Sequence, residues 1–301
     1  MSDRQQVQRL KELAYQMRRK LVLLCGSYEG SVHIGGDLSM TDVMVALFNH
    51  TLNLSPDRIQ DPERDRFVLG KGHGAVGMYI AMELRGFFDF DQIVKTYGKM
   101  DSAFGMHPCK LRLPALECSG GSLGQGLAIC VGMALSAKQK KQKHRVFCML
   151  GDGETCEGEV WESIMSARAF GLGNLIALVD RNRQMMTSYT EDSIMLEPYP
   201  DKWKAFGWNV VEIDGNDMEQ IVNALDALPD GSGTVPTVVI CNTIKGKGIS
   251  FMEKQIDWHL GHLNAEVAQA ALKELDMNHN TLGGAKSWRF VMNPFSPLAE
   301  R

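Results

Sequence analysis

Apolar runs long enough to cross a membrane are missing from this chain of 301 residues. A membrane-spanning helix needs about 20 consecutive apolar residues, and no stretch of the sequence approaches that length. The N-terminus is charged and lacks the apolar segment and the small-residue cleavage site of a signal peptide. These absences predict a cytoplasmic protein that has no membrane partner.

Patterned cysteines and basic runs are also missing. The seven cysteines are odd in number and never form C-x-x-C, which argues against a zinc site or a disulfide scaffold and favours reduced thiols. The net charge is −4, and the one short basic stretch, 138–143, is typical of a solvated surface turn. We therefore expect no nucleic-acid partner. The hydrophobic content of 44% is ordinary for a globular chain that buries a large core.

A strand–turn–helix–strand pattern organises the middle of the chain. An apolar run over 145–150 leads to Asp152, a helix is predicted over 157–170, and a second apolar run over 174–180 leads to Asn182. Two parallel strands joined by a helix place both following turns at the carboxyl edge of the sheet. Asp152 and Asn182 are therefore expected to lie side by side.

The chemistry of this pair indicates a divalent cation. A carboxylate from Asp152, an amide oxygen from Asn182 and a nearby backbone carbonyl make a cage that suits Mg²⁺ or Ca²⁺ with sites left for phosphate oxygens. Gly151 and Gly153 allow the backbone to approach a diphosphate closely. Each polar residue alone is equally well explained as a turn residue, but the combined pattern is harder to explain in that way.

Periodicity and turn residues predict the remaining elements. Helices are expected over 4–25, 40–52, 88–97, 127–137, 217–228 and 264–275, and strands over 67–69, 209–213 and 236–243. The helix over 127–137 is apolar nearly all round, so it should be buried. The glycine-rich stretch 30–39 is expected to be a loop, and 185–200 an irregular segment.

The stretch 151–184, with its GDG, EG, WE and D-x-N elements, resembles the thiamine-diphosphate motif, and in its details that of transketolase. The resemblance covers nearly the whole chain and matches the N-terminal, diphosphate-binding domain of that family. It implies an α/β fold in which a parallel sheet is flanked by helices. Residues 1–301 would form one such domain, with 1–25 as an N-terminal helix and 278–301 as a C-terminal arm.

Two histidine segments resemble loops at the transketolase active site. His33 fits the histidine of a Ser-Gly-His-Pro-Gly loop, although Val32 and Ile34 replace the flanking Gly and Pro. In the Trp-His segment near the end of the chain, His259 is preferred over His262, which is more simply explained as a surface histidine.

Two more histidine segments follow the same family pattern. His73 follows a strand in a Gly-Lys-Gly-His turn and matches the histidine that contacts the diphosphate, and Lys71 beside it would add positive charge. His107 fits the family's Gly-His-Pro turn, with Met106 in place of the Gly. Lys245 and Lys247 also lie in a glycine-rich turn, but the family pattern gives lysines no role there.

The resemblance assigns roles to these residues. The implied catalytic residues are His33, His107, His259 and Glu157, the last as part of an acidic link between two active sites. The implied contacts of thiamine diphosphate are His73, Gly120, Ser122, Leu123, Gly151, Asp152, Gly153, Glu154, Asn182 and His259. The implied ligands of Mg²⁺ (or Ca²⁺ or Mn²⁺) are Asp152, Asn182 and the carbonyl of Gln184.

One group that the cofactor needs is not found. Thiamine chemistry requires a carboxylate against the pyrimidine ring, and in transketolases that Glu lies in the following, pyrimidine-binding domain. The resemblance therefore implies a split enzyme, active only with a separate subunit that carries the pyrimidine-binding and C-terminal domains, in an α₂β₂ complex. Its reaction would move a two-carbon ketol unit from a ketose (phosphate) to an aldose (phosphate).

Other functions stay open at this point. The enzyme could be a specialised transketolase for a sulfo-sugar or a branched pentose. It could also be a 2-oxo-acid dehydrogenase α subunit or part of a deoxyxylulose-phosphate synthase, although the Ser-Leu-Gly-Gln-Gly loop at 122–126 and the three histidines favour transketolase. A non-catalytic cofactor-binding or scaffolding subunit is the alternative from another class.

Overall fold

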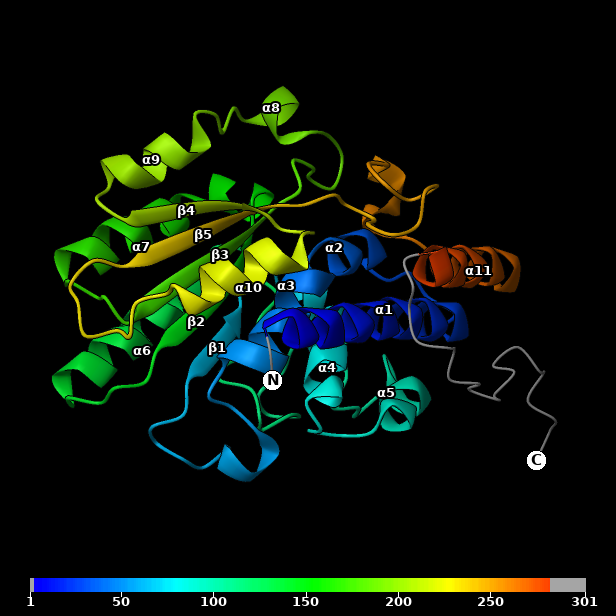
Figure 1. Ribbon diagram of the computed structural model, residues 1–301, viewed down its shortest axis with the longest axis horizontal. Helices are drawn as coiled ribbons and strands as arrows, with labels where there is room; N and C mark the ends of the chain where they lie inside the picture. The colour runs from blue at the N-terminus through cyan, green and yellow to red at the C-terminus, as the bar shows by residue number, and fades with distance from the viewer. Residues whose placement is uncertain (1–2, 282–301) are drawn as a thin grey trace.

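Five parallel strands form the central sheet of the computed structural model, which describes residues 3–281 (Figure 1). The strands are β1 (Arg66–Leu69), β2 (Val146–Gly151), β3 (Leu175–Arg181), β4 (Asn209–Asp214) and β5 (Thr237–Asn242). Their order across the sheet is β1-β2-β3-β5-β4, and every neighbouring pair is parallel. Since parallel strands end at the same edge, the turns that follow them come together there. The predicted parallel sheet is confirmed.

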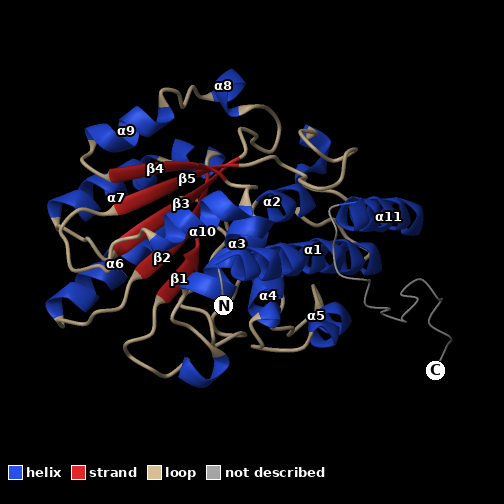
Figure 2. Cartoon of the chain, in the orientation of Figure 1, coloured by secondary structure: helices blue, strands red, loops and turns tan. Residues whose placement is uncertain are grey.

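Helices cover both faces of the sheet, as Figure 2 shows. On one side lie α1 (Asp3–Ser27), α3 (Thr41–Ala46), α4 (Ala75–Leu84), α10 (Met218–Asp226) and α11 (Ala265–Thr281), with α5 (Phe90–Thr96) beside α4. On the other side lie α6 (Gln125–Gln139), α7 (Gly158–Ala169) and α9 (Tyr199–Ala205). The remaining helical pieces are α2 (Ile34–Ser39), α8 (Thr190–Ser193) and the single turns η1 (Leu47–Thr51), η2 (Pro56–Arg58), η3 (Gly72–Gly74), η4 (Gly153–Cys156) and η5 (Ile256–His259).

The alternation of side chains along the strands divides the core in two. On β2, Phe147 and Met149 pack with the α1 side, whereas Cys148 and Leu150 pack with the α6 side. All six residues of β2 are buried. A strand covered on both faces is therefore a continuous apolar run, and this run is what made the strand predictable.

Two predictions about elements are wrong. The helix predicted as buried corresponds to α6, where Gly132 is exposed and Met133 is half-buried. The stretch predicted as a loop contains α2, which begins directly after His33. Helix α11 includes the first residues of the predicted arm, 278–281, and the rest of that arm, 282–301, lies outside the described residues. No helix among residues 3–281 has the length and apolarity needed to cross a membrane.

Candidate active site at the carboxyl edge of the sheet

The turns after β2 and β3 lie against each other, as the sequence predicts. Gly151 pairs with Asp180 in the register of the two strands, and the amide of Asp152 donates to the carbonyl of Asp180 at 3.3 Å. The amide of Arg183 then spans the two turns and donates to Asp152 Oδ2 at 2.6 Å. Asp152 and the turn that contains Asn182 therefore share one place at the sheet edge.

The Asp152 carboxylate is held by three donors. Oδ2 accepts from Arg183 N and from Arg181 Nη1 at 3.0 Å, and Oδ1 accepts from Gly153 N at 2.8 Å. Burial raises the pKa of Asp152, while the Arg181 guanidinium acts in the opposite direction. A carboxylate has about four lone-pair sites, so three hydrogen bonds leave room for one more ligand.

Asn182 is oriented by its own hydrogen bonds. Its Nδ2 donates to Asp180 Oδ2 at 3.0 Å, and its Oδ1 accepts from the amide of Gln184 at 3.0 Å. Because Nδ2 is committed to a carboxylate, the oxygen is the end left for a cation. The Gln184 carbonyl accepts from Lys245 Nζ at 3.3 Å.

Lys71 and Asp180 form a buried ion pair beneath these turns. Lys71 Nζ lies 2.6 Å from Asp180 Oδ2, and their side chains are 1% and 0% exposed. The same carboxylate accepts from Ser39 Oγ at 2.6 Å and from Thr243 Oγ1 at 2.5 Å. Burial would raise the pKa of Asp180, but Lys71 and these hydroxyls outweigh it and lower the pKa. Within this chain the charge of Lys71 is therefore paired with that of Asp180.

Four imidazoles gather beside this edge, although they come from four separate segments. His33 has its ring centroid 5.2 Å from that of His73, 5.5 Å from that of His259 and 6.2 Å from that of His107. His73 and His259 are 5.4 Å apart. All four predicted histidines thus meet at one place, whereas His262 is exposed elsewhere, with Nδ1 3.3 Å from a backbone carbonyl.

Three of these imidazoles, those of His33, His73 and His259, are held neutral. Burial, together with neighbouring histidines and lysines, lowers the pKa of His33 to about 4, of His73 to about 2 and of His259 to about 3. A neutral imidazole carries one donor and one acceptor nitrogen, so it can both give and take a proton. His33 Nδ1 is buried without a partner among the described residues.

Lys245 is a site residue that the sequence did not predict. It is 2% exposed, and its Nζ lies 2.7 Å from His259 Nδ1 and 3.0 Å from the carbonyl of Met185. Burial, followed by the charge of Lys71, lowers the pKa of Lys245 to about 8. Because an ammonium can only donate, Nδ1 of His259 must accept, and its Nε2 carries the proton that faces outward from this pair. No sequence signal marks this contact between positions 14 residues apart.

Lys247, by contrast, lies away from the histidines. Its Nζ is 3.5 Å from Glu253 Oε1, and its side chain is 34% exposed. The two lysines of this turn therefore differ in environment, and only Lys245 joins the site.

Close packing of glycines shapes the cofactor turns. A Cβ on Gly72 would lie 2.6 Å from the amide of Gly121, so the two turns touch through their backbones. A Cβ on Gly151 would meet nothing closer than Lys71 Cβ at 3.7 Å. Contacts at this distance are ordinary ones, so packing within the described chain does not require glycine at 151.

The other predicted residues occupy distinct places. Glu154 is buried, and its carboxylate accepts from the amides of Gly124 and Gly151, both at 3.1 Å. Burial raises the pKa of Glu154 to about 7. Its side chain thus clamps the turn after β2 to the start of α6. Glu157, at the start of α7, is exposed, as are Gly120 and Ser122, while Leu123 is half-buried.

The residues present fit a diphosphate with a divalent cation. The donor set is one carboxylate, one amide oxygen and one carbonyl, all hard oxygens. Among residues 3–281, no group of three or more His, Cys, Asp or Glu side chains is arranged to hold a metal, so the cation would depend on phosphate oxygens for further ligands. The unpartnered Nδ1 of His33 lies beside the same edge.

The chain is similar to proteins of one family. A family model described as "Transketolase, thiamine diphosphate binding domain" matches residues 11–283. The chain is 37% identical over 270 residues to a protein of Phocaeicola vulgatus that is named as one subunit of an apulose-4-phosphate transketolase, covering 90% of this chain and 95% of that protein. It is 38% identical over 258 residues to "6-deoxy-6-sulfo-D-fructose transketolase subunit SqwG" of Clostridium sp., covering 86% and 93%.

A solved structure agrees with these relatives. The crystal structure of transketolase from Campylobacter jejuni superposes with a TM-score of 0.81 at 28% identity. The match covers 90% of this chain and 43% of that one. This chain thus spans nearly the full length of the two subunits and less than half of the longer transketolase.

Proposed function

This chain belongs to the transketolase family, and on that basis we propose that it is the diphosphate-binding subunit of a split transketolase. The enzyme would bind thiamine diphosphate with Mg²⁺ and move a two-carbon unit from a ketose phosphate to an aldose phosphate. The observation that carries this proposal is the meeting of His33, His73, His107 and His259 beside the Asp152 turn. A scaffolding protein would have no use for four imidazoles in one place.

The chain's own residues divide the work. When bound, thiamine diphosphate supplies the nucleophile and electron sink for cleaving and forming the carbon–carbon bond. Asp152, Asn182 Oδ1 and the Gln184 carbonyl would hold the cation, and His73 would face the diphosphate. His33 and His259 would hydrogen-bond substrate hydroxyls and orient them, because a neutral imidazole has one donor and one acceptor nitrogen.

Lys245 prepares His259 for that task. By donating to Nδ1 it fixes the tautomer in which Nε2 carries the proton. It also keeps a positive charge beside the site, which favours an anionic substrate or cofactor group. His107, which is exposed, stands at the open side of the cluster.

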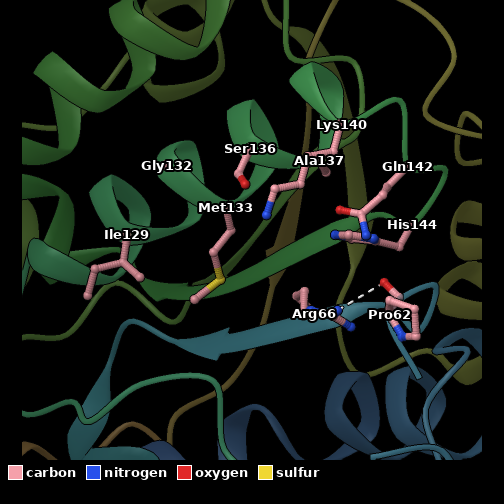
Figure 3. Close-up of a pocket in the computed structure, with 10 residues that line it drawn as sticks. All are labelled: Pro62, Arg66, Ile129, Gly132, Met133, Ser136, Ala137, Lys140, Gln142 and His144. Atoms are coloured by element: carbon pink, nitrogen blue, oxygen red, sulfur yellow. Dashed lines mark hydrogen bonds between the residues drawn. The ribbon is translucent and has the colours of Figure 1, made fainter. Parts of the chain in front are cut away.

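A partner subunit would cover an open face of α6. Figure 3 shows side chains of α6, among them Ile129 and Met133, pointing into an open pocket of about 610 Å³ opposite Arg66 and His144. A helix of globular proteins normally buries its apolar residues, and this face of α6 is not covered by the described chain. We infer that the pyrimidine-binding subunit or a second copy covers it within an α₂β₂ complex. The seven free thiols favour a cytoplasmic enzyme.

The substrate would be a specialised sugar phosphate or a related anionic sugar. The two relatives named above carry such sugars in their names, which motivates the proposal. Of the three departures from the family loops, Val32 and Ile34 are 1% and 0% exposed and belong to the core. Met106 is half-buried beside His107, so it is the departure best placed to affect substrate choice.

The test begins with the complex from the native host. The chain, captured with its partner, is weighed by native mass spectrometry with Mg²⁺ and thiamine diphosphate, and the complex is then assayed for ketol transfer on a panel of sugar phosphates and sulfo-sugars. A stoichiometric second subunit with two cofactors per α₂β₂ and transfer activity would support the proposal. A homodimer that binds no cofactor would overturn it in favour of the scaffolding role. A complex that oxidises 2-oxo acids would replace it with the dehydrogenase alternative.

A further inference from the structure

Arg181 lies between Asp180 and Asn182, and its side chain is 1% exposed. We propose that Arg181 is a positioning residue for the metal site. It fixes the carboxylate of Asp152 and links it by hydrogen bonds to the segment 190–197, so that this segment and the turn after β2 are ordered together. The inference rests on the proposed function, because Asp152 is a metal ligand only if the chain binds the cofactor with its cation.

The guanidinium of Arg181 donates hydrogen bonds both to Asp152, in the turn after β2, and to the segment 190–197. Nη1 lies 3.0 Å from Asp152 Oδ2 and 3.1 Å from Thr190 Oγ1. Nη2 lies 3.2 Å from Glu191 Oε1 and 2.8 Å from Glu197 Oε1. The planar fork of arginine suits such divided bonding, and a lysine ammonium could not reach all of these oxygens at once.

The ring of Tyr199 supports the guanidinium from below. The Cζ atom of Arg181 lies 4.9 Å from the centroid of that ring, and Tyr199 is itself fully buried. A planar cation over an aromatic face is favourable. The side chain is thus held on a face as well as at both nitrogens, which makes its position a fixed part of the fold.

The two glutamates extend the connection into the backbone. Glu191 accepts from the amides of Leu196 and Glu197, at 3.2 Å and 3.3 Å, and Glu197 accepts from the amide of Tyr199 at 2.8 Å. A continuous series of hydrogen bonds therefore links Asp152, through Arg181, to the backbone of residues 196–199. Within this segment Leu196 packs into the core at 2% exposure, whereas Ile194 and Met195 are 52% and 73% exposed, so most of it is held by hydrogen bonds.

This geometry leaves Asp152 prepared for a cation. Arg181 and the Arg183 amide both bind Oδ2, whereas Oδ1 accepts only the Gly153 amide within the described chain. The bound Oδ2 fixes the carboxylate plane, and Oδ1 keeps a free lone pair. Groups that orient a metal ligand in this way usually change metal affinity about 10- to 100-fold when they are removed.

The experiment uses the full chain with its co-purified partner. Binding of Mg²⁺ in saturating thiamine diphosphate is measured by calorimetry, and hydrogen exchange of residues 185–198 by mass spectrometry, for the wild type, Arg181→Met, Arg181→Lys and Glu197→Gln. Lys202→Met is the matched control, because Lys202 Nζ also holds this segment, through the Met195 carbonyl at 3.0 Å, but does not touch Asp152.

The expected pattern is graded. Arg181→Met should weaken Mg²⁺ binding about 10-fold or more and speed exchange of the segment. Arg181→Lys should recover only part of the loss, and Glu197→Gln, a surface change remote from the metal, should weaken binding a few-fold through Arg181. Lys202→Met should leave Mg²⁺ affinity unchanged.

The contrary results are equally distinct. Mg²⁺ affinity within about twofold of the wild type in both Arg181→Lys and Glu197→Gln would overturn the inference. Should Arg181→Met fail to fold, these two milder variants decide the outcome alone. A wild-type complex that binds neither Mg²⁺ nor thiamine diphosphate would instead refute the proposed function, so the two failures are separable.

Discussion

Lys71 and Asp180 pair directly beneath the two turns of the site, with Nζ 2.6 Å from Oδ2 and neither side chain accessible to solvent. They join β3 to the turn after β1, and Ser39 at the end of α2 and Thr243 directly after β5 bring two further segments to the same carboxylate. One buried ion pair therefore fixes the relative positions of four segments that carry site residues. A pair of this kind contributes chiefly through the cost of breaking it.

The first prediction concerns that cost. Lys71→Met should lower the free energy of unfolding by about 3–5 kcal/mol, because it leaves a buried carboxylate without its counter-charge. Urea unfolding of the purified chain measures the change. Lys204→Met is the control, because its partner Asp201 lies at 3.0 Å but the two side chains are 57% and 66% exposed; solvent screens such pairs, so no measurable change is expected. Equal effects of the two substitutions would contradict the assignment.

The second prediction concerns acid. The pKa of His33 is lowered from 6.5 to about 4, so the unfolded chain binds a proton at His33 before the folded chain does. Its contribution to stability is fully present above pH 6.5, is lost as the pH falls from 6.5 to about 4, and does not change further below that. His33→Asn should therefore flatten the decline of unfolding free energy over this window.

Urea unfolding at several pH values between 7 and 4 measures this effect. The control is His262→Asn, which changes an exposed histidine outside the cluster and should leave the wild-type curve in place. A decline that is as steep in His33→Asn as in the wild type would show that His33 titrates normally in the folded chain.

Much of this site could be predicted from the sequence, because its signals are local. The strands before Asp152 and Asn182 are continuous apolar runs, and their parallel pairing sets the two turns together. Each histidine could be assigned from its own neighbouring residues. That the four rings meet depends on the topology, which the family resemblance supplied and the structure confirms.

The features that the sequence did not predict depend on contacts between distant segments. Gly35 and Gly36 indicated a loop, but a Cβ on Gly35 would lie 2.5 Å from the Trp258 carbonyl, so glycine there permits close packing of a helix. Lys245 and Arg181 gave no signal, because their partners lie in other segments. Similarly, α6 was predicted as buried from its apolar composition, which cannot distinguish a core face from a face that the described chain leaves uncovered.

The third prediction tests the role of Lys245. Burial is the main cause that lowers the pKa of His259 to about 3, and the charge of Lys245 is the next. Lys245→Met should therefore raise the pKa of His259 while leaving it below 6.5, the value of a free imidazole. It should also release Nδ1, so that both tautomers become populated.

Nuclear magnetic resonance of a histidine-labelled chain reports both the titration and the tautomer. Lys247→Met is the matched control, because Lys247 lies in the same turn but pairs with Glu253 at 3.5 Å. An unchanged His259 signal in Lys245→Met, or the same shift in both variants, would refute the contact as the cause.

The last prediction concerns an added methyl group at Gly151. This residue ends β2, and an added Cβ would meet nothing closer than 3.7 Å. Gly151→Ala should therefore leave the melting temperature of the ligand-free chain unchanged or slightly higher, since replacing glycine stabilises by about 0.4–1 kcal/mol where the backbone permits it. If a bound diphosphate approaches the backbone closely at Gly151, the added methyl group should obstruct it. Affinity for thiamine diphosphate should then fall about 10-fold or more, which corresponds to about 1.4 kcal/mol of binding free energy.

Two other glycines separate the possible causes. Gly233→Ala adds a Cβ with nothing within 4 Å at an exposed position before β5, so it should neither destabilise the chain nor affect cofactor affinity. Gly72→Ala places a Cβ 2.6 Å from the Gly121 amide, so it should destabilise the ligand-free chain directly. A Gly151→Ala chain that binds the cofactor as tightly as the wild type would mean that the diphosphate does not approach the backbone at this position.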